Sequence, residues 1–261
     1  MGKRTTVIVF IISTVLFSSM PLAIQAEEVI VAFAKWPPWK IIEDDQFEGI
    51  DARIIRSVAK QHGFSIKFIQ CPWPRCVDMA KSGEIDLITS FGKTKEREKY
   101  VYYLGPPYHI EYLRFYVRKD SDILIQKYED LYGKNIGTIK GSIYFSKFDQ
   151  DPKLTKSIVN LEMQMFQMLH NNRIETFIGY ETVMDYLLLV KGFQEKFNKV
   201  AFQMPGPGSH IAISKRSKAL KWRFVISKTI QDMTRSGEIH KIIDEFLSGV
   251  TTLHNKEKIR Q

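Results

Sequence analysis

Short apolar segments with strand and helix spacing alternate along most of this chain, and this alternation constrains the fold more than any other feature. Residues 29–33 are typical of a buried strand, residues 50–58 keep helical apolar spacing up to a stop near Gly63, and residues 65–70 again favour a strand. The pattern continues with a helix at residues 76–82 and strands at residues 86–90 and 112–117. Such alternation predicts an α/β fold with mostly parallel pairing.

A second unit of the same kind begins near residue 130. Its predicted strands are residues 135–139, 175–179 and 199–202, and its predicted helices are residues 161–169 and 181–190. The run PGPG at residues 205–208 interrupts the pattern, which resumes at residues 211–214 and closes with helices at residues 220–235 and 238–247. Because the two units are small and alike, we expect two lobes that face a common cleft.

The first 26 residues have the three parts of a secretory signal peptide. Lys3 and Arg4 precede an apolar core at residues 7–17, and small residues lead to a predicted cleavage after Ala26. Serines and a proline interrupt the apolar run, so it falls short of the roughly 18 residues that a membrane span requires. The first cysteine of the chain is Cys71, and we therefore expect no lipid anchor at the cleavage site. We expect a soluble protein exported to the periplasm.

The charge of the chain is basic, but the basic residues do not form a nucleic-acid footprint. Removing Lys3 and Arg4 lowers the formal net charge from +9 to +7, because residues 1–26 contain no acid, and 261 − 26 = 235 residues remain. The remaining basic residues are scattered or mixed with acids, as in KTKEREK at residues 93–99. In an exported protein this pattern indicates a solvated basic surface, which helps to attract anionic ligands.

The chain has only two cysteines, Cys71 and Cys76, in the segment CPWPRC. A zinc site would need further ligands, and no histidine stands at a metal-ligand spacing. A thioredoxin-like redox role requires two residues between the cysteines rather than four. In an oxidising compartment the segment therefore predicts a local disulfide worth about 2 kcal/mol, which fixes how Trp73 and Arg75 are presented. We expect no cofactor and no metal.

The segment SGEIDLITSFGKTKER, residues 82–97, joins a predicted buried strand to a turn rich in small and hydroxyl residues. Arg97 follows this turn at the predicted start of a helix, where backbone N–H groups already favour an anion. A planar guanidinium offers two parallel N–H donors, which match a carboxylate. Arg97 is therefore a candidate carboxylate ligand, although this segment alone favours a surface arginine in a helix cap rich in lysine and glutamate.

The order of the motifs resembles the bacterial periplasmic solute-binding proteins of family 3, which serve polar amino acid ABC transporters. The resemblance covers about residues 29–247. The motifs that carry it are WPPW at residues 36–39, EGID at 48–51, SGEID at 82–86, TKER at 94–97, GPPY at 105–108, LYGKNIG at 131–137 with KGS at 140–142, and SGEI at 236–239. Each motif is weak alone, but their order is specific.

The resemblance implies an α/β fold of the two-lobed type 2 periplasmic binding class, in which two strands cross between the lobes. The first lobe is expected at residues 27–113 and again, after the chain returns, at residues 208–250. The second lobe is expected at residues 114–207, and a polar tail at residues 251–261. Closure of the two lobes would trap a ligand in the cleft between them.

The resemblance also implies roles for particular residues. Arg97 matches the arginine that pairs with the ligand's α-carboxylate, Ser90 and Thr94 match polar contacts in the same turn, and Ser142 matches a second-lobe donor to that carboxylate. Glu181 stands where an aspartate usually receives the α-ammonium group. Trp36 or Trp39 would stack on the ligand's side chain. Asp51 is most simply read as a helix N-cap.

These features favour a binding protein that captures a small polar, amino-acid-like ligand for an ABC permease, and we expect a monomer. Two alternatives stay open. The same scaffold carries periplasmic dehydratases acting on arogenate or prephenate, for which Glu111, Glu162 or Glu181 could supply the acid. A receptor that passes its ligand to a membrane sensor is the other. A sugar stacked on Trp36, Trp39 and Trp73 is the alternative ligand.

Overall fold

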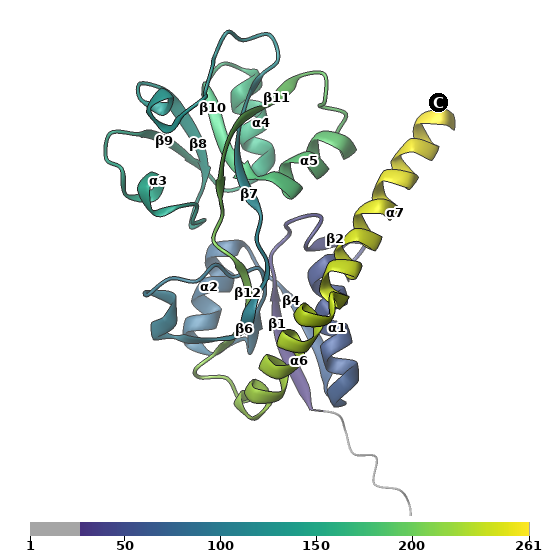
Figure 1. Cartoon of the computed structure of the whole chain (residues 1–261). Helices are drawn as coiled ribbons and strands as arrows, with labels where there is room; N and C mark the ends of the chain where they lie inside the picture. Colours follow the sequence, from purple (N-terminus) through teal and green to yellow (C-terminus); the bar gives the residue numbers. More distant parts are fainter. Residues whose placement is uncertain (1–26, 261) are drawn as a thin grey trace, which may run out of the picture.

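The computed structural model describes the backbone of residues 27–260 and the side chains of residues 27–252. The predicted signal peptide, residues 1–26, lies outside this part of the chain. Within the described residues, no helix combines the length and apolarity that a membrane crossing requires. The chain forms two lobes, one above the other in Figure 1, each built on its own five-stranded sheet.

The sheet of the first lobe has the strand order β4-β1-β5-β12-β6. Its strands are β1 (Glu28–Phe33), β4 (Ser65–Gln70), β5 (Leu87–Ile88), β6 (Val101–His109) and β12 (Ser209–Ser214). β1 pairs in parallel with β4 and β5, whereas β12 runs antiparallel to β5 and β6. The hairpin of β2 (Ile41–Glu43) and β3 (Gln46–Glu48) lies outside this sheet.

The sheet of the second lobe repeats this plan with the order β11-β7-β10-β8-β9. Its strands are β7 (Tyr112–Arg118), β8 (Asn135–Ile139), β9 (Thr155–Val159), β10 (Thr176–Tyr180) and β11 (Phe197–Pro205). β8 pairs in parallel with β9 and β10, and β7 runs antiparallel to β10 and β11. In each lobe the strand that leaves a crossing, β12 or β7, runs antiparallel to its two neighbours, so the pairing is more mixed than the sequence predicted.

The chain crosses between the lobes twice. The first crossing joins β6 to β7 through Ile110 and Glu111, and the second joins β11 to β12 through residues 206–208. Figure 1 shows both crossings as neighbouring extended segments between the lobes. The Gly206 N–H donates to the carbonyl oxygen of Glu111 at 2.8 Å, so the two crossings are bonded to each other. This pair of crossings fits the hinge that the resemblance implied.

Helices cover both sheets. The first lobe carries α1 (Ile50–His62), α2 (Trp73–Ser82), α6 (Arg223–Ser236) and α7 (Glu238–Arg260), and the second carries α3 (Ser146–Gln150), α4 (Glu162–His170) and α5 (Glu181–Val190). In the part of the chain that the structure describes, three 3₁₀ turns, η1 (Arg97–Lys99), η2 (Tyr128–Leu131) and η3 (Leu220–Trp222), complete the elements. The backbone of α7 continues as a helix to Arg260, through residues 251–260 of the expected polar tail.

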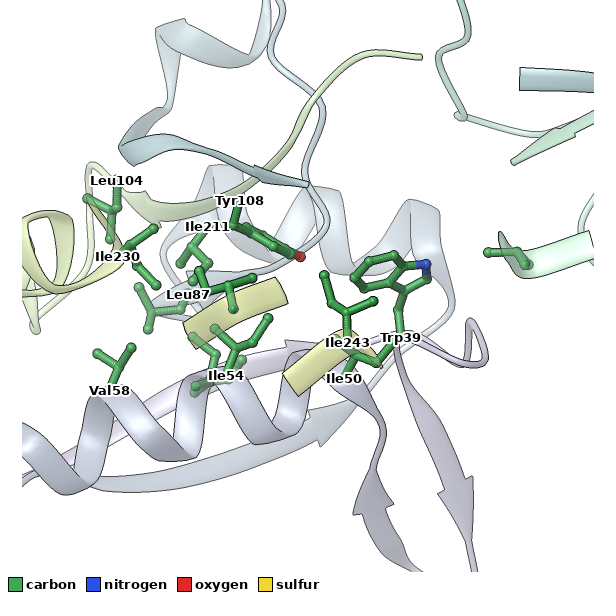
Figure 2. Close-up of a cluster of buried hydrophobic side chains, with 14 of the residues drawn as sticks. Trp39, Ile50, Ile54, Val58, Leu87, Leu104, Tyr108, Ile211, Ile230 and Ile243 are labelled. Atoms are coloured by element: carbon green, nitrogen blue, oxygen red, sulfur yellow. The ribbon is translucent and has the colours of Figure 1, made fainter. Parts of the chain in front are cut away.

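The first-lobe core forms where α1, α6 and α7 pack on the sheet. The apolar residues of α1 recur at helical spacing, so Ile50, Ile54 and Val58 all point into this core (Figure 2). Gly49 precedes α1 with φ +107°, and a Cβ there would lie 2.5 Å from the Trp39 carbonyl oxygen. Only glycine permits this approach, through which the Asp51 N–H donates to the Trp39 oxygen at 2.9 Å.

Candidate functional site

A cavity of about 550 Å³ lies between the lobes. Its first-lobe wall includes residues that follow β1, β4 and β5, and its second-lobe wall includes residues that follow β8 and β9 and the last residue of β10. The carboxyl ends of parallel strands leave backbone groups and loops free for a ligand, and open α/β sheets bind ligands at such edges. The topology of both sheets therefore converges on this cavity.

Arg97 lies in the wall of this cavity as the first residue of η1. Its Nη1 donates to the Gly92 carbonyl oxygen at 2.8 Å, and its Nη2 donates across the cleft to the Gly141 carbonyl oxygen at 3.3 Å. The guanidinium carbon lies 4.1 Å from the centre of the Phe91 ring. Burial lowers the pKa of Arg97. No carboxylate among the described residues forms an ion pair with this buried cation.

A second first-lobe donor shares the Gly141 carbonyl. Trp73 Nε1 donates to the same oxygen at 3.2 Å, and Trp73 also lines the cavity. Trp73 begins α2 inside the loop that Cys71 and Cys76 close; the structure confirms the predicted disulfide between them, with a Cα–Cα distance of 5.4 Å. The disulfide thus closes the turn from which Trp73 reaches the second lobe.

Ser90 lines the cavity, and a buried carboxylate fixes its position. Its backbone has φ +52°, a conformation that few residues other than glycine adopt. The Ser90 and Thr89 hydroxyls donate to Asp51 Oδ2 at 2.7 and 2.6 Å. The Tyr108 hydroxyl donates to Asp51 Oδ1 at 2.7 Å. Asp51 therefore fixes the turn that carries Ser90. The expected helix N-cap role of Asp51 is wrong, because the residue before α1 is Gly49 and Asp51 makes no capping bond.

Lys40 completes this network, although no sequence motif marks it as a site residue. Its Nζ lies 3.1 Å from Asp51 Oδ2 and donates to the Thr89 carbonyl oxygen at 3.2 Å. Both side chains of the pair are almost fully buried, with exposed fractions of 2% and 1%. Burial lowers the pKa of Lys40, and the Asp51 charge opposes that shift. Lys40 lines the cavity, with Nζ 5.4 Å from the centre of the Trp36 ring.

The two candidate tryptophans have different places. Trp36 lines the cavity, and its ring meets the ring of Tyr180 from the second lobe edge-on at 5.3 Å. Trp39 has no exposed surface; its indole lies in the first-lobe core against His109, at 4.7 Å between ring centres. Figure 2 shows Trp39 beside Ile50 and Ile243 in this core. Trp36 therefore faces the cleft, and Trp39 supports the lobe.

The remaining predicted residues divide in the same way. Ser142 lines the cavity next to Gly141, whereas Thr94 does not. The Thr94 hydroxyl instead accepts a hydrogen bond from the Arg97 N–H, at 3.1 Å, at the start of η1. The resemblance placed Glu181 on the ligand. The structure places it outside the cavity lining, with its Oε1 at 2.6 Å from Lys199 Nζ and 3.3 Å from Arg114 Nε.

Two further acids lie near the cleft: Glu111 is buried, and Glu162 is half-buried. Glu162, the first residue of α4, lines the cavity, and burial raises its pKa to about 7. Glu111 lies in the first crossing, where its Oε2 accepts the Thr182 N–H at 3.2 Å. Burial raises the pKa of Glu111 to about 8. Among the described residues, no group of three or more acidic, histidine or cysteine side chains could hold a metal ion.

Comparisons with known proteins agree with this geometry. The family model of bacterial extracellular solute-binding proteins, family 3, matches residues 29–249. The arginine-binding extracellular protein ArtP of Bacillus subtilis is 25% identical over 220 residues, covering 83% of this chain and 84% of that protein. A probable histidine-binding protein of Campylobacter jejuni is 27% identical over 152 residues, which cover 55% of this chain and 56% of that protein, less than two thirds of its length.

The fold also matches solved structures. An amino acid ABC transporter substrate-binding protein of Streptococcus pneumoniae, bound to L-arginine, superposes with a TM-score of 0.72. It is 21% identical, and the match covers 85% of this chain and 95% of that chain. This likeness confirms the predicted two-lobed α/β fold class.

Proposed function

The chain belongs to the bacterial extracellular solute-binding proteins, family 3, and on that premise we propose that it captures a small amino-acid-like ligand in the cavity between its lobes. The observation that carries the proposal is the position of Arg97. A buried guanidinium whose side-chain hydrogen bonds go to carbonyl oxygens leaves its charge uncompensated, and a ligand carboxylate would compensate it.

We assign the neighbouring polar groups to the same ligand end. Ser90 and Ser142 line the cavity on opposite lobes, so their hydroxyls can donate to a carboxylate held on Arg97. Thr94 acts through Arg97, whose backbone N–H it binds. Trp36 and Tyr180 supply the aromatic surface for the ligand's side chain. Neither Trp39 nor Glu181 receives a ligand contact.

We propose that the captured ligand passes to the permease of an ABC importer. The signal-peptide pattern of residues 1–26 and the family match support a role outside the cytoplasm, and we place the mature protein in the periplasm as a monomer. Capture by lobe closure needs no chemistry at the ligand, and we propose that the protein is not an enzyme. Arogenate and prephenate should therefore decay in its presence only at their spontaneous rates.

A thermal-shift screen of the mature protein tests the proposed function. The panel contains the standard L-amino acids together with neutral sugars, organic acids and polyamines. A bound ligand at about 100 times its Kd should add roughly 2.7 kcal/mol of stability. Arg97→Ala should abolish the shift that an amino acid produces. Stabilisation by a sugar, with no response to any amino acid, would contradict the proposal.

A further inference from the structure

Glu162 is the one acidic side chain among the described residues that line the cavity. It follows β9 on the second lobe and begins α4, whereas Arg97 lies on the first lobe. The cavity thus has a buried cation on one wall and an acid on the other. Glu181, the acid that the resemblance favoured, already pairs with Arg114 and Lys199 outside the cavity.

The environment of Glu162 penalises its charge. The start of a helix stabilises a carboxylate and would lower its pKa. The pKa of Glu162 is nevertheless raised to about 7, because removal from water outweighs that effect. No basic side chain among the described residues lies within 4.0 Å of its carboxyl group. Of the other cavity-lining cations, Lys40 and Arg75 pair with Asp51 and Glu84, and Lys35 and Lys140 line the cavity as well.

A desolvated acid without a cationic partner is a common mark of a binding site, because a ligand can supply the missing charge. Arg97, in the same cavity of about 550 Å³, is the opposite case: a buried cation without an anionic partner. An amino acid zwitterion can compensate the charges of both Glu162 and Arg97, because its ammonium and carboxylate groups are attached to one carbon. A ligand with only one of the two groups would leave the other wall uncompensated.

We propose that Glu162 receives the α-ammonium group of an amino acid whose carboxylate lies on Arg97. This assignment rests on the proposed function and adds a contact for the second charged group of the ligand. Because Arg97 and Glu162 belong to different lobes, both charged groups of the ligand are bound only when the lobes are closed. Selection then depends on the presence of both charged groups on the ligand, before any contact with its side chain.

The test compares each amino acid with its deaminated acid. The tightest binder among the standard L-amino acids is measured by calorimetry beside the same molecule without its α-amino group; for arginine this is 5-guanidinopentanoic acid. Wild type should prefer the amino acid by roughly 100-fold or more. In Glu162→Gln the amino acid should lose about that factor, while the deaminated acid binds within about threefold of wild type. Binding of the deaminated acid also reports that the variant is folded.

The matched control is Glu129→Gln, which removes a half-exposed acid from the same lobe, where it pairs with Lys147. Three outcomes would overturn the assignment while leaving the proposed function intact. Glu162→Gln could bind the amino acid normally, it could lose both ligands equally, or the selective loss could occur in Glu181→Gln instead. A wild type that binds none of the amino acids would overturn the proposed function and the assignment with it.

Discussion

Ligand affinity should rise with pH, because Glu162 must be ionised to receive an ammonium group. With a pKa of about 7, Glu162 is ionised in about one molecule in ten at pH 6 and in about nine in ten at pH 8. If the ionised form alone makes the contact, the apparent Kd at pH 6 should be about tenfold higher than at pH 8. The affinity levels off above the pKa of about 7, because Glu162 in the free protein is already ionised there.

The proton count gives an independent readout of the same event. At pH 7 about half of the Glu162 carboxyls carry a proton, so ligand binding should release about half a proton per site. Calorimetry in two buffers of different ionisation enthalpy measures this release directly. In Glu162→Gln both the proton release and the tenfold change should disappear. An affinity that stays flat between pH 6 and pH 8, or an equal slope in Glu162→Gln, would refute the reasoning.

Other titrating groups make the glutamine variant necessary. The charged and titratable groups that share the cavity or act on Glu162 are Lys35, Lys40, Arg75, Arg97, Lys140, Tyr144 and Tyr180. Lysine, arginine and tyrosine ordinarily keep their charge state between pH 6 and pH 8. Glu111 in the crossing, with a pKa of about 8, titrates in this window. Any slope that persists in Glu162→Gln therefore reports Glu111 or another group.

Further predictions concern the supports of the cavity. Arg97→Ala and Arg97→Lys should both weaken amino acid binding, by roughly 3–5 kcal/mol for alanine, because a lysine cannot reproduce the planar fork; calorimetry measures the loss, and binding within a few-fold of wild type would contradict it. Asp51→Asn should cost about 3–5 kcal/mol in urea unfolding, because it leaves Lys40 buried without an acid; an unchanged unfolding midpoint would speak against the pair. Replacing Cys71 and Cys76 by serine should cost about 2 kcal/mol in the same assay, and free thiols in the exported wild type would exclude the disulfide there.

The sequence predicted the fold class and the place of Arg97 beside the cleft because both depend on local patterns. Apolar spacing identified most core elements, and the strand, turn and arginine of residues 82–97 are adjacent in the chain. β6 was not predicted because Gly105, Pro106 and Pro107 interrupt it, and such residues are rare in strands. β9, at the edge of its sheet, was not predicted either, because it has no clear apolar alternation.

The site could not be completed from the sequence because neighbouring residues point in different directions. Tyr180 ends β10 and lines the cavity, while Glu181 begins α5 and faces Lys199; a shift of one residue at a strand end reverses the direction of a side chain. Trp36 and Trp39 flank the same two prolines, so the sequence does not show which of them faces the cavity. Packing of Trp39 against His109, far away in the chain, places Trp39 in the core. Asp51 could not be recognised as a hub, because Thr89, Ser90 and Tyr108 lie about 40 or more residues away.

The Gly141 carbonyl, shared by Arg97 and Trp73, has a kinetic consequence. Separation of the lobes must break both bonds, each worth about 0.5–1.5 kcal/mol once water replaces it. If both bonds form in the closed protein with and without a ligand, they favour closure equally in the two cases. They would then slow association and dissociation together, with little effect on the Kd. Residence time therefore depends in part on a group that does not contact the ligand's charges: Trp73→Phe should speed exchange in stopped-flow measurements, whereas Arg97 and Glu162 decide how much ligand is bound.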